Sequence, residues 1–197
     1  MYRRLFCTAL FITAVLTPEF ASAQQTAFMR PYGPAAPPHG FVRFCAAAPA
    51  ECGKDERQVA RFNASAERLR ELDRVNRAVN EAIAPVTDLE NYGVNEYWAL
   101  PRTKGDCEDY SLLKRHILIK KGWPVSSLLL TVVRDEKGEG HAVLTARTTQ
   151  GDYVLNNKLE DVRLWSETPY QFVMRQSYLN PLVWVAIDNT ISTATAK

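Results

Sequence analysis

The sequence predicts an α+β fold, with helices in the N-terminal half packed on an antiparallel sheet formed by the C-terminal half. Apolar residues recur at helical spacing before residue 124, and short apolar segments separated by glycine-containing turns follow it. Helices followed by strands, without regular alternation of the two, are typical of α+β domains.

Two helices are predicted in the first half. One covers about 63–84, where Asn63 or Ser65 is the candidate N-cap and Pro85 ends the helix. The other covers about 106–121 and stops at Gly122. The apolar stripe of the first helix is formed by Leu69, Leu72, Val75, Val79 and Ile83.

The strands follow the second helix. A loop rich in aromatic residues, 88–104, connects the two helices. This density of aromatic residues favours a loop packed over a cleft, although packing alone would also explain it. The predicted strands are 128–133, 141–147, 153–155, 172–174 and 183–187.

The N-terminus predicts export. A basic start, a short apolar run and the tripeptide Ala-Ser-Ala make residues 1–23 a signal peptide, with an uncleaved anchor as the alternative. A flexible Pro- and Ala-rich arm is expected over 24–40, one folded domain over 41–190, and a frayed tail over 191–197. The interpretation places a soluble protein in the periplasm.

Charge argues against a nucleic-acid partner. The formal net charge is +2, and no basic stretch with interleaved aromatic residues is present.

Export also affects how the cysteines are interpreted, because three of them remain after the signal peptide is cleaved. We expect Cys45 and Cys52 to form a disulfide across a short loop of small residues, with two buried thiols as the alternative. Such a loop stabilises the fold by about 2–3 kcal/mol. Cys107 then remains as the free thiol.

Cys107 has the setting of a nucleophile. It follows Asp106, a favoured N-cap residue, and the free N–H groups of a helix start stabilise a thiolate and a developing oxyanion. Glu108 and Asp109 oppose the thiolate, so a nearby histidinium is required. The alternative is a buried structural cysteine.

Among the three histidines, His141 is the predicted base. His39 lies in the Pro-rich arm, and His116 lies about two and a half turns along the helix of Cys107, too far for a direct bond. His141 follows a turn and begins a strand, so its ring can face the end of a helix.

The base needs an acceptor that orients its ring. The candidates are Asp152, Asn156, Asn157 and Asp161. Asn156 is favoured because it ends the strand that follows the His141 strand in a hairpin, and Asp161 is the next choice.

At these residues the chain resembles the bacterial transglutaminase-like cysteine proteinases, which include the LapG-type periplasmic proteases. The resemblance extends from about residue 40 to 188. It is carried by the segments YWALP (97–101), GDCEDY (105–110), GHAVL (140–144) and YVLNN (153–157).

The resemblance implies a papain-like or transglutaminase-like core and a Cys–His–Asp triad. Cys107 and His141 match two members, and the third falls on Asn156, where the family has Asp. An Asn serves this role in papain-like enzymes, so the departure is compatible with activity.

The resemblance further implies calcium, although the chemistry itself requires no cofactor. The calcium ligands would be Asp106 and Glu108, with Asp109 as a further candidate, and carboxylate oxygens suit this ion. The alternative is that these acidic residues are ordinary residues of a helix start and bind no ion. A protein substrate such as a large surface adhesin and a regulatory inner-membrane partner are also implied, while the oligomeric state stays open.

The sequence therefore predicts an exported cysteine endopeptidase that cleaves a periplasmic or surface protein. Trp98 or backbone N–H groups would complete the oxyanion site. One alternative is a transglutaminase-like enzyme that transfers the acyl group to an amine, since both share the acyl-enzyme. Another is a non-catalytic binding module that kept the fold.

Overall fold

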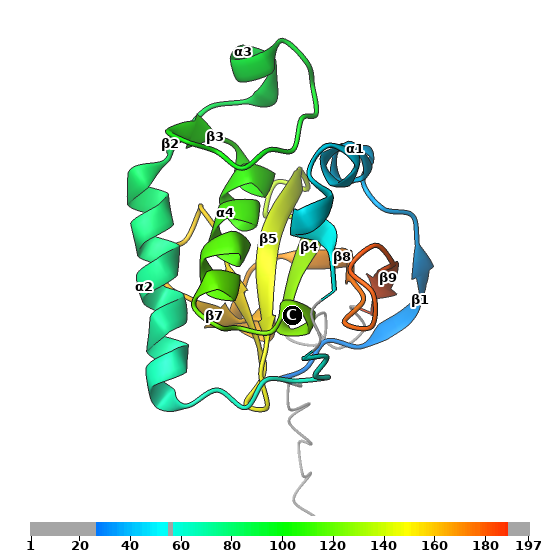
Figure 1. Cartoon of the computed structure of the whole chain (residues 1–197), viewed down its shortest axis with the longest axis vertical. Coiled ribbons are helices and arrows are strands. Elements are labelled where there is room, and N and C mark those ends of the chain that lie inside the picture. Colours follow the sequence, from blue (N-terminus) through cyan, green and yellow to red (C-terminus); the bar gives the residue numbers. More distant parts are fainter. Residues whose placement is uncertain (1–26, 55–56, 189–197) are drawn as a thin grey trace, which may run out of the picture.

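A computed structural model describes residues 27–54 and 57–188 and shows helices packed on one face of an antiparallel sheet (Figure 1). The α+β class predicted from the sequence is confirmed. The expected signal peptide (1–23) and tail (191–197) lie outside the described residues. Within the described ranges, no helix combines the length and apolarity needed to cross a membrane.

The sheet has seven strands in the described part of the chain, and every neighbouring pair is antiparallel. Its order is β1-β9-β8-β4-β5-β6-β7. All five predicted strands are present, and the sequence missed the two edge strands, β1 and β7. The strands are β1 (Pro31–Ala35), β4 (Leu128–Arg134), β5 (Gly140–Arg147), β6 (Asp152–Leu155), β7 (Arg163–Leu164), β8 (Gln171–Gln176) and β9 (Trp184–Ile187).

Both predicted helices are present as α2 and α4. The Ser65 side chain caps α2 by accepting a hydrogen bond from the Arg68 N–H, which decides between the two candidate caps. The helices are α1 (His39–Ala47), α2 (Ala66–Ala82), α3 (Asp88–Tyr92) and α4 (Cys107–Lys120), with short 3₁₀ turns at Pro49–Cys52, Val125–Ser127 and Trp165–Glu167.

Alternation along the strands divides the core between the two faces of the sheet. Leu130, Leu144 and Leu155 belong to the larger core, which also contains the apolar side chains of α2 and α4. Val133 and Val143 belong to a second core on the other face. Figure 1 shows α2 and α4 side by side, with α4 next to β5. This packing brings the start of α4 to the sheet.

The Pro-rich arm expected over 24–40 is corrected by the structure. Residues 31–35 form the edge strand β1 and pair with β9. Met29 is buried, and its N–H donates to Asp152. Pro31 and Pro34 fit because an edge strand leaves one row of backbone groups unpaired. Residues 31–35 of the expected arm are thus part of the sheet.

The loop expected over 88–104 contains the short helix α3. A capping box between Thr87 and Glu90 starts α3, and Gly93 ends it with a φ of 74°. A small parallel pair then joins β2 (Ala84–Pro85) to β3 (Lys104–Gly105). The capped helix α3 and the β2–β3 pair hold this segment beside the first turn of α4, where the candidate active site lies.

Candidate active site

Cys107 is the first residue of α4 and lies against the start of β5. Its Sγ accepts a hydrogen bond from the Ala142 N–H at 3.4 Å and donates to Glu108 Oε2 at 3.1 Å. Ser111 Oγ reinforces the contact by donating to the carbonyl oxygens of Cys107 and Ala142. The fold therefore places the thiol beside Ala142, the residue that follows His141, and the pairing of Cys107 with His141 stays a prediction.

The surroundings of Cys107 keep its thiol protonated in this structure. Burial raises the pKa of Cys107 well above its ordinary value, and the Glu108 carboxylate raises it further. The helix start and the Ala142 N–H act in the opposite direction but do not outweigh these effects. Activation of Cys107 therefore requires a change in the charge around it.

His141 is buried at the start of β5. Its ring lies edge-on to the ring of Tyr170, with 5.6 Å between centroids, and its Nε2 has no hydrogen-bond partner. Burial lowers the pKa of His141 to about 4, and Lys158 and the buried Lys114 add to the effect, so the imidazole is neutral. None of the hydrogen bonds of Cys107 reaches this ring within the described residues.

Asn156 ends β6, as predicted, and is buried. Its Oδ1 accepts hydrogen bonds from the backbone N–H groups of Lys158 (2.6 Å) and Leu159 (3.0 Å), and from the Tyr170 hydroxyl (3.4 Å). Its Nδ2 is buried without a partner. No hydrogen bond joins Asn156 to the ring of His141 in the described residues, and the orienting role of Asn156 stays a prediction.

Two other candidates for the third residue, Asp152 and Asp161, have different partners, whereas Oδ1 of the fourth, Asn157, is buried without one. Asp152 is fully buried and pairs with Arg61 at 2.6 Å. Asp161 is exposed and pairs with Arg77 at the surface. Asp161, the second choice from the sequence, is therefore held away from the buried ring of His141.

The remaining histidine on α4, His116, faces away from the site. Its Nδ1 lies 2.9 Å from a carboxylate oxygen of Glu51, which belongs to the 3₁₀ turn after α1. This contact agrees with the exclusion of His116 as the base.

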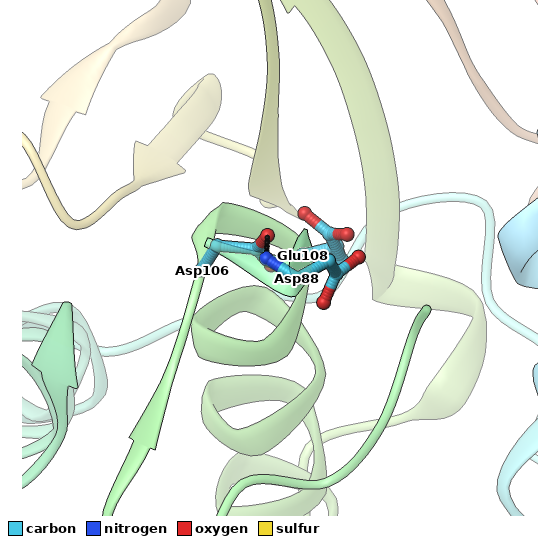
Figure 2. Close-up of side chains that lie close together, drawn as sticks. All are labelled: Asp88, Asp106 and Glu108. Carbon is cyan, nitrogen blue, oxygen red and sulfur yellow. Dashed lines mark hydrogen bonds between the residues drawn. The ribbon is translucent and has the colours of Figure 1, made fainter. Parts of the chain in front are cut away.

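Three carboxylates gather at the start of α4. Oxygen atoms of Asp88, Asp106 and Glu108 lie within 4.8 Å of one another, and Figure 2 shows the Asp88 and Glu108 side chains together beside Asp106. Asp106 is at the N-cap position but makes no side-chain cap bond. Instead its Oδ2 accepts from the Asp88 N–H at 3.2 Å, and its Oδ1 is buried without a partner.

This acidic cluster is electrostatically unbalanced. Burial and the neighbouring Asp106 raise the pKa of Glu108 to about 9. Burial also raises the pKa of Asp88, and the charge of Asp106 adds to it. Buried like charges are stable only when protons or a cation neutralise them. The oxygen donors, the unpartnered Asp106 oxygen and the excess of negative charge fit a hard cation such as calcium.

Asp109, a further calcium candidate from the sequence, is not in the cluster. Its Oδ1 accepts from the Ala99 N–H at 2.8 Å, and burial raises its pKa to about 7. A Cβ atom at Gly105 would lie 2.5 Å from Asp109 Oδ2, so only glycine permits this close approach. Asp109 therefore links the 88–104 loop to α4 through its hydrogen bond with Ala99.

Trp98 is held by contacts with Glu96 and Phe41, and its expected part in the oxyanion site stays a prediction. Its indole N–H donates to Glu96 Oε1 at 2.7 Å, and its ring packs edge-on against Phe41 of α1. A side chain at Gly40 would collide with this indole. Because the N–H is already used, the backbone N–H groups at the start of α4 are the remaining oxyanion donors from the sequence analysis.

A match to a family model shows which family the chain belongs to. The family model of the bacterial transglutaminase-like cysteine proteinases (BTLCP) matches residues 31–192. The chain belongs to this family. Its members are cysteine peptidases, in agreement with the resemblance carried by the segments around Cys107 and His141. No curated protein sequence gives a significant match.

Solved structures of LapG from Legionella pneumophila have a similar fold. Calcium-bound LapG from Legionella pneumophila aligns with a TM-score of 0.51 and 23% identity, over 59% of this chain and 67% of LapG. The EGTA-treated form of that LapG gives 0.50 and 22%, over 61% and 68%. These likenesses show that the chain shares its fold with LapG.

Sequence reasoning missed two residues of the site. Asp88 lies 18 positions before Asp106, and only the turn through α3 brings it to α4. Tyr170 contacts both the ring of His141 and the amide of Asn156 from the segment before β8. The capping box Thr87–Glu90 signals the helix that carries Asp88, whereas no local pattern marks Tyr170.

Proposed function

We propose that this protein is an exported cysteine endopeptidase in which Cys107 is the nucleophile and His141 the base. The free thiol at the first residue of α4, in contact with the backbone beside His141, carries the proposal. Membership of the cysteine proteinase family supports the same chemistry.

The reaction would follow the usual two steps of a cysteine peptidase. Cys107 Sγ attacks the peptide carbonyl carbon while its proton passes to His141, and the carbonyl electrons move to the oxygen. Backbone N–H groups at the start of α4 stabilise that oxyanion. His141 then protonates the leaving amine, the C–N bond breaks, and water hydrolyses the thioester. In a free enzyme such catalytic hydrogen bonds are often unformed until substrate binds.

Asn156 would orient the ring of His141 during these reaction steps. Its amide oxygen is held by the Lys158 and Leu159 N–H groups, close to Tyr170, which itself contacts the ring. A modest movement of the loop after β6 would bring the unpartnered Nε2 of His141 to an acceptor. The substitution of Asn for the Asp of the family removes a full charge from this acceptor.

The acidic cluster is our proposed calcium site, with Asp88, Asp106 and Glu108 as the ligands. When bound, the cation would neutralise carboxyl groups that now raise the pKa of Cys107, among them Glu108, which accepts a hydrogen bond from the thiol. The residues thus link cation binding to the state of the nucleophile.

Export to the periplasm, a large surface adhesin as substrate and a regulatory inner-membrane partner complete the proposal. They rest on the N-terminal segment and on the family resemblance.

The test is cleavage and thiol labelling with the purified mature protein in calcium. Incubation with periplasmic and surface proteins should give defined fragments, and Cys107→Ala should abolish them at unchanged melting temperature. His141→Ala should slow alkylation of Cys107 at neutral pH by about 100-fold or more, as expected for loss of a general base. The matched control is His116→Ala, whose alkylation rate should equal that of the parent.

A protein that binds but never cleaves its target, with a thiol that alkylates at the rate of a free cysteine, would refute catalysis and favour the binding module. Equal effects of His141→Ala and His116→Ala would refute the assignment of the base. Incorporation of an amine into the products would favour acyl transfer.

A further inference from the structure

A buried basic cluster lies at the other end of the sheet from the candidate active site. Arg147, the last residue of β5, is 6% exposed, and Arg175 of β8 is 2% exposed. His141 is at the opposite end of β5, about 20 Å away at the rise of an extended strand. The cluster is therefore separate from the cysteine and from the acidic residues around it.

The acceptors available to these arginines are too few. Arg147 Nε and Nη1 have no hydrogen-bond partner, and neither has Arg175 Nε. In the part of the chain that the structure describes, the hydrogen bond recorded for Arg175 runs from Nη1 to the Gln176 carbonyl at 3.0 Å. The guanidinium of Arg147 lies 4.7 Å from the ring centre of Tyr178.

The charges of the cluster do not balance either. Asp152 is the carboxylate that pairs with it in the described residues, and its Oδ1 already binds Arg61 at 2.6 Å, leaving Arg147 Nε at 3.9 Å. The other Asp152 oxygen accepts from the Met29 N–H. In the described residues, the guanidinium groups of Arg61 and Arg147 therefore share one carboxylate, and Arg175 adds a further positive charge nearby. Burial lowers the pKa of Arg175 to about 10, and the nearby charge of Arg147 adds to this effect.

Water alone would not resolve this imbalance. A buried water molecule can accept hydrogen bonds from the free N–H groups, but it leaves the excess positive charge in a medium of low dielectric. A guanidinium offers a planar set of donors that matches the oxygen atoms of phosphate or sulfate. Arg61, which is 24% exposed, marks the side nearest to solvent.

We propose that Arg147 and Arg175 form an internal binding site for a small oxyanion, phosphate or sulfate, beside Tyr178 and Asp152. The anion supplies the acceptors that the unpartnered N–H groups lack and offsets the charge that Asp152 leaves uncompensated. It stabilises the fold and takes no part in peptide hydrolysis, so the site is independent of the proposed function.

The experiment is thermal unfolding of the mature protein titrated with phosphate or sulfate, with chloride at matched ionic strength as the reference. Specific binding gives a saturable rise in melting temperature, of roughly 3 °C or more at saturation. Arg175→Met removes one side of the site and should abolish the saturable rise. The matched control is Arg163→Met, whose exposed arginine on β7 leaves the rise unchanged.

General salt effects of sulfate raise stability in proportion to concentration without saturating. An equal, linear rise in the parent and in both variants would therefore overturn the proposal, as would no rise at all. If Arg175→Met does not fold, the titration of the parent protein still tests the proposal. Saturation with phosphate or sulfate but not with chloride supports the site, and its absence refutes it.

Discussion

Asn156 has one observed role, in the turn after β6, and one proposed role, as the partner of His141. Its amide oxygen holds the turn after β6 through the N–H groups of Lys158 and Leu159. Its side chain is also the candidate partner of His141, whose Nε2 is buried and unpartnered. Asn156→Ala would therefore loosen the turn as well as the ring, so its effects would be mixed. A substitution that keeps the turn acceptor separates them.

Asn156→Asp is that substitution. One carboxylate oxygen can keep the turn bonds, and the negative charge should raise the pKa of His141 above its lowered value of about 4. We expect faster alkylation of Cys107 at neutral pH, measured as labelling rate against pH, with little change in melting temperature. The control Tyr170→Phe removes the long hydrogen bond to Asn156 and should change the rate much less.

An unchanged pH profile for Asn156→Asp, together with full activity of Asn156→Ala, would show that Asn156 has no orienting role. Its contacts with Lys158 and Leu159 would then be purely structural.

At the scale of elements, a disulfide joins α1 to the following 3₁₀ turn. Cys45 and Cys52 are bonded, seven positions apart, in agreement with the sequence-based pairing. The Cys45→Ala and Cys52→Ala double variant should lose about 2–3 kcal/mol of unfolding free energy, because the short loop is freed in the unfolded chain. Urea unfolding measures this loss.

Alkylation of Cys107 is the internal control for the disulfide. Its rate should stay at the parent value, because the disulfide lies on α1 and the contacts of the thiol come from α4 and β5. A large drop in that rate would show that α1 supports the active site directly.

The turn between β4 and β5 depends on Asp135. Its Oδ1 accepts from the Lys137 and Glu139 N–H groups, and its Oδ2 bonds Lys158 Nζ at 2.6 Å. The bond to Lys158 lowers the pKa of Asp135 from 3.8 to about 2. The carboxylate therefore adds stability that is complete above pH 3.8 and is lost as the pH falls through about 2.

Asp135→Asn keeps the turn acceptor and removes the charge. We expect it to be less stable than the parent above about pH 4, with a difference that shrinks as the pH falls and vanishes below about pH 2. Urea unfolding across that range checks the trend. Glu136→Gln, which changes an exposed side chain of the same turn, should show no such dependence. A constant difference at every pH would contradict the assignment to Lys158.

At the scale of the whole molecule, calcium should change stability through the acidic cluster. A cation that binds only the folded chain stabilises it by about 2.7 kcal/mol at a hundredfold excess over Kd, which is roughly 5–10 °C in melting temperature. We expect this rise when calcium is added to chelator-treated protein. Asp88→Asn should remove most of it, and the exposed Asp161→Asn should leave it intact.

A calcium response that is equal in Asp88→Asn and Asp161→Asn would place the cation elsewhere. No response at millimolar calcium would refute the site. Either result leaves the roles of Cys107 and His141 to be decided by the labelling experiments.

The sequence by itself determined the fold class, both long helices, five of the strands and the place of Cys107. These features depend on local pattern: apolar spacing along α2, the stop at Gly122 and the start of a helix at Asp106 are all readable over a few residues. The same local reasoning excluded His116, whose separation from Cys107 along one helix is fixed by helix geometry.

Tertiary structure alone decided which distant residues meet. Pro31–Ala35 looks like a flexible arm until pairing with β9 makes it a strand, because its hydrogen-bond partners lie at the other end of the chain. Asp88 becomes a neighbour of Asp106 only through α3, and Tyr170 reaches His141 across the sheet. Arg147 and Arg175 gain their shared burial from strands β5 and β8, on either side of β4. Long-range pairing leaves no periodic trace in the sequence, so these contacts required the fold.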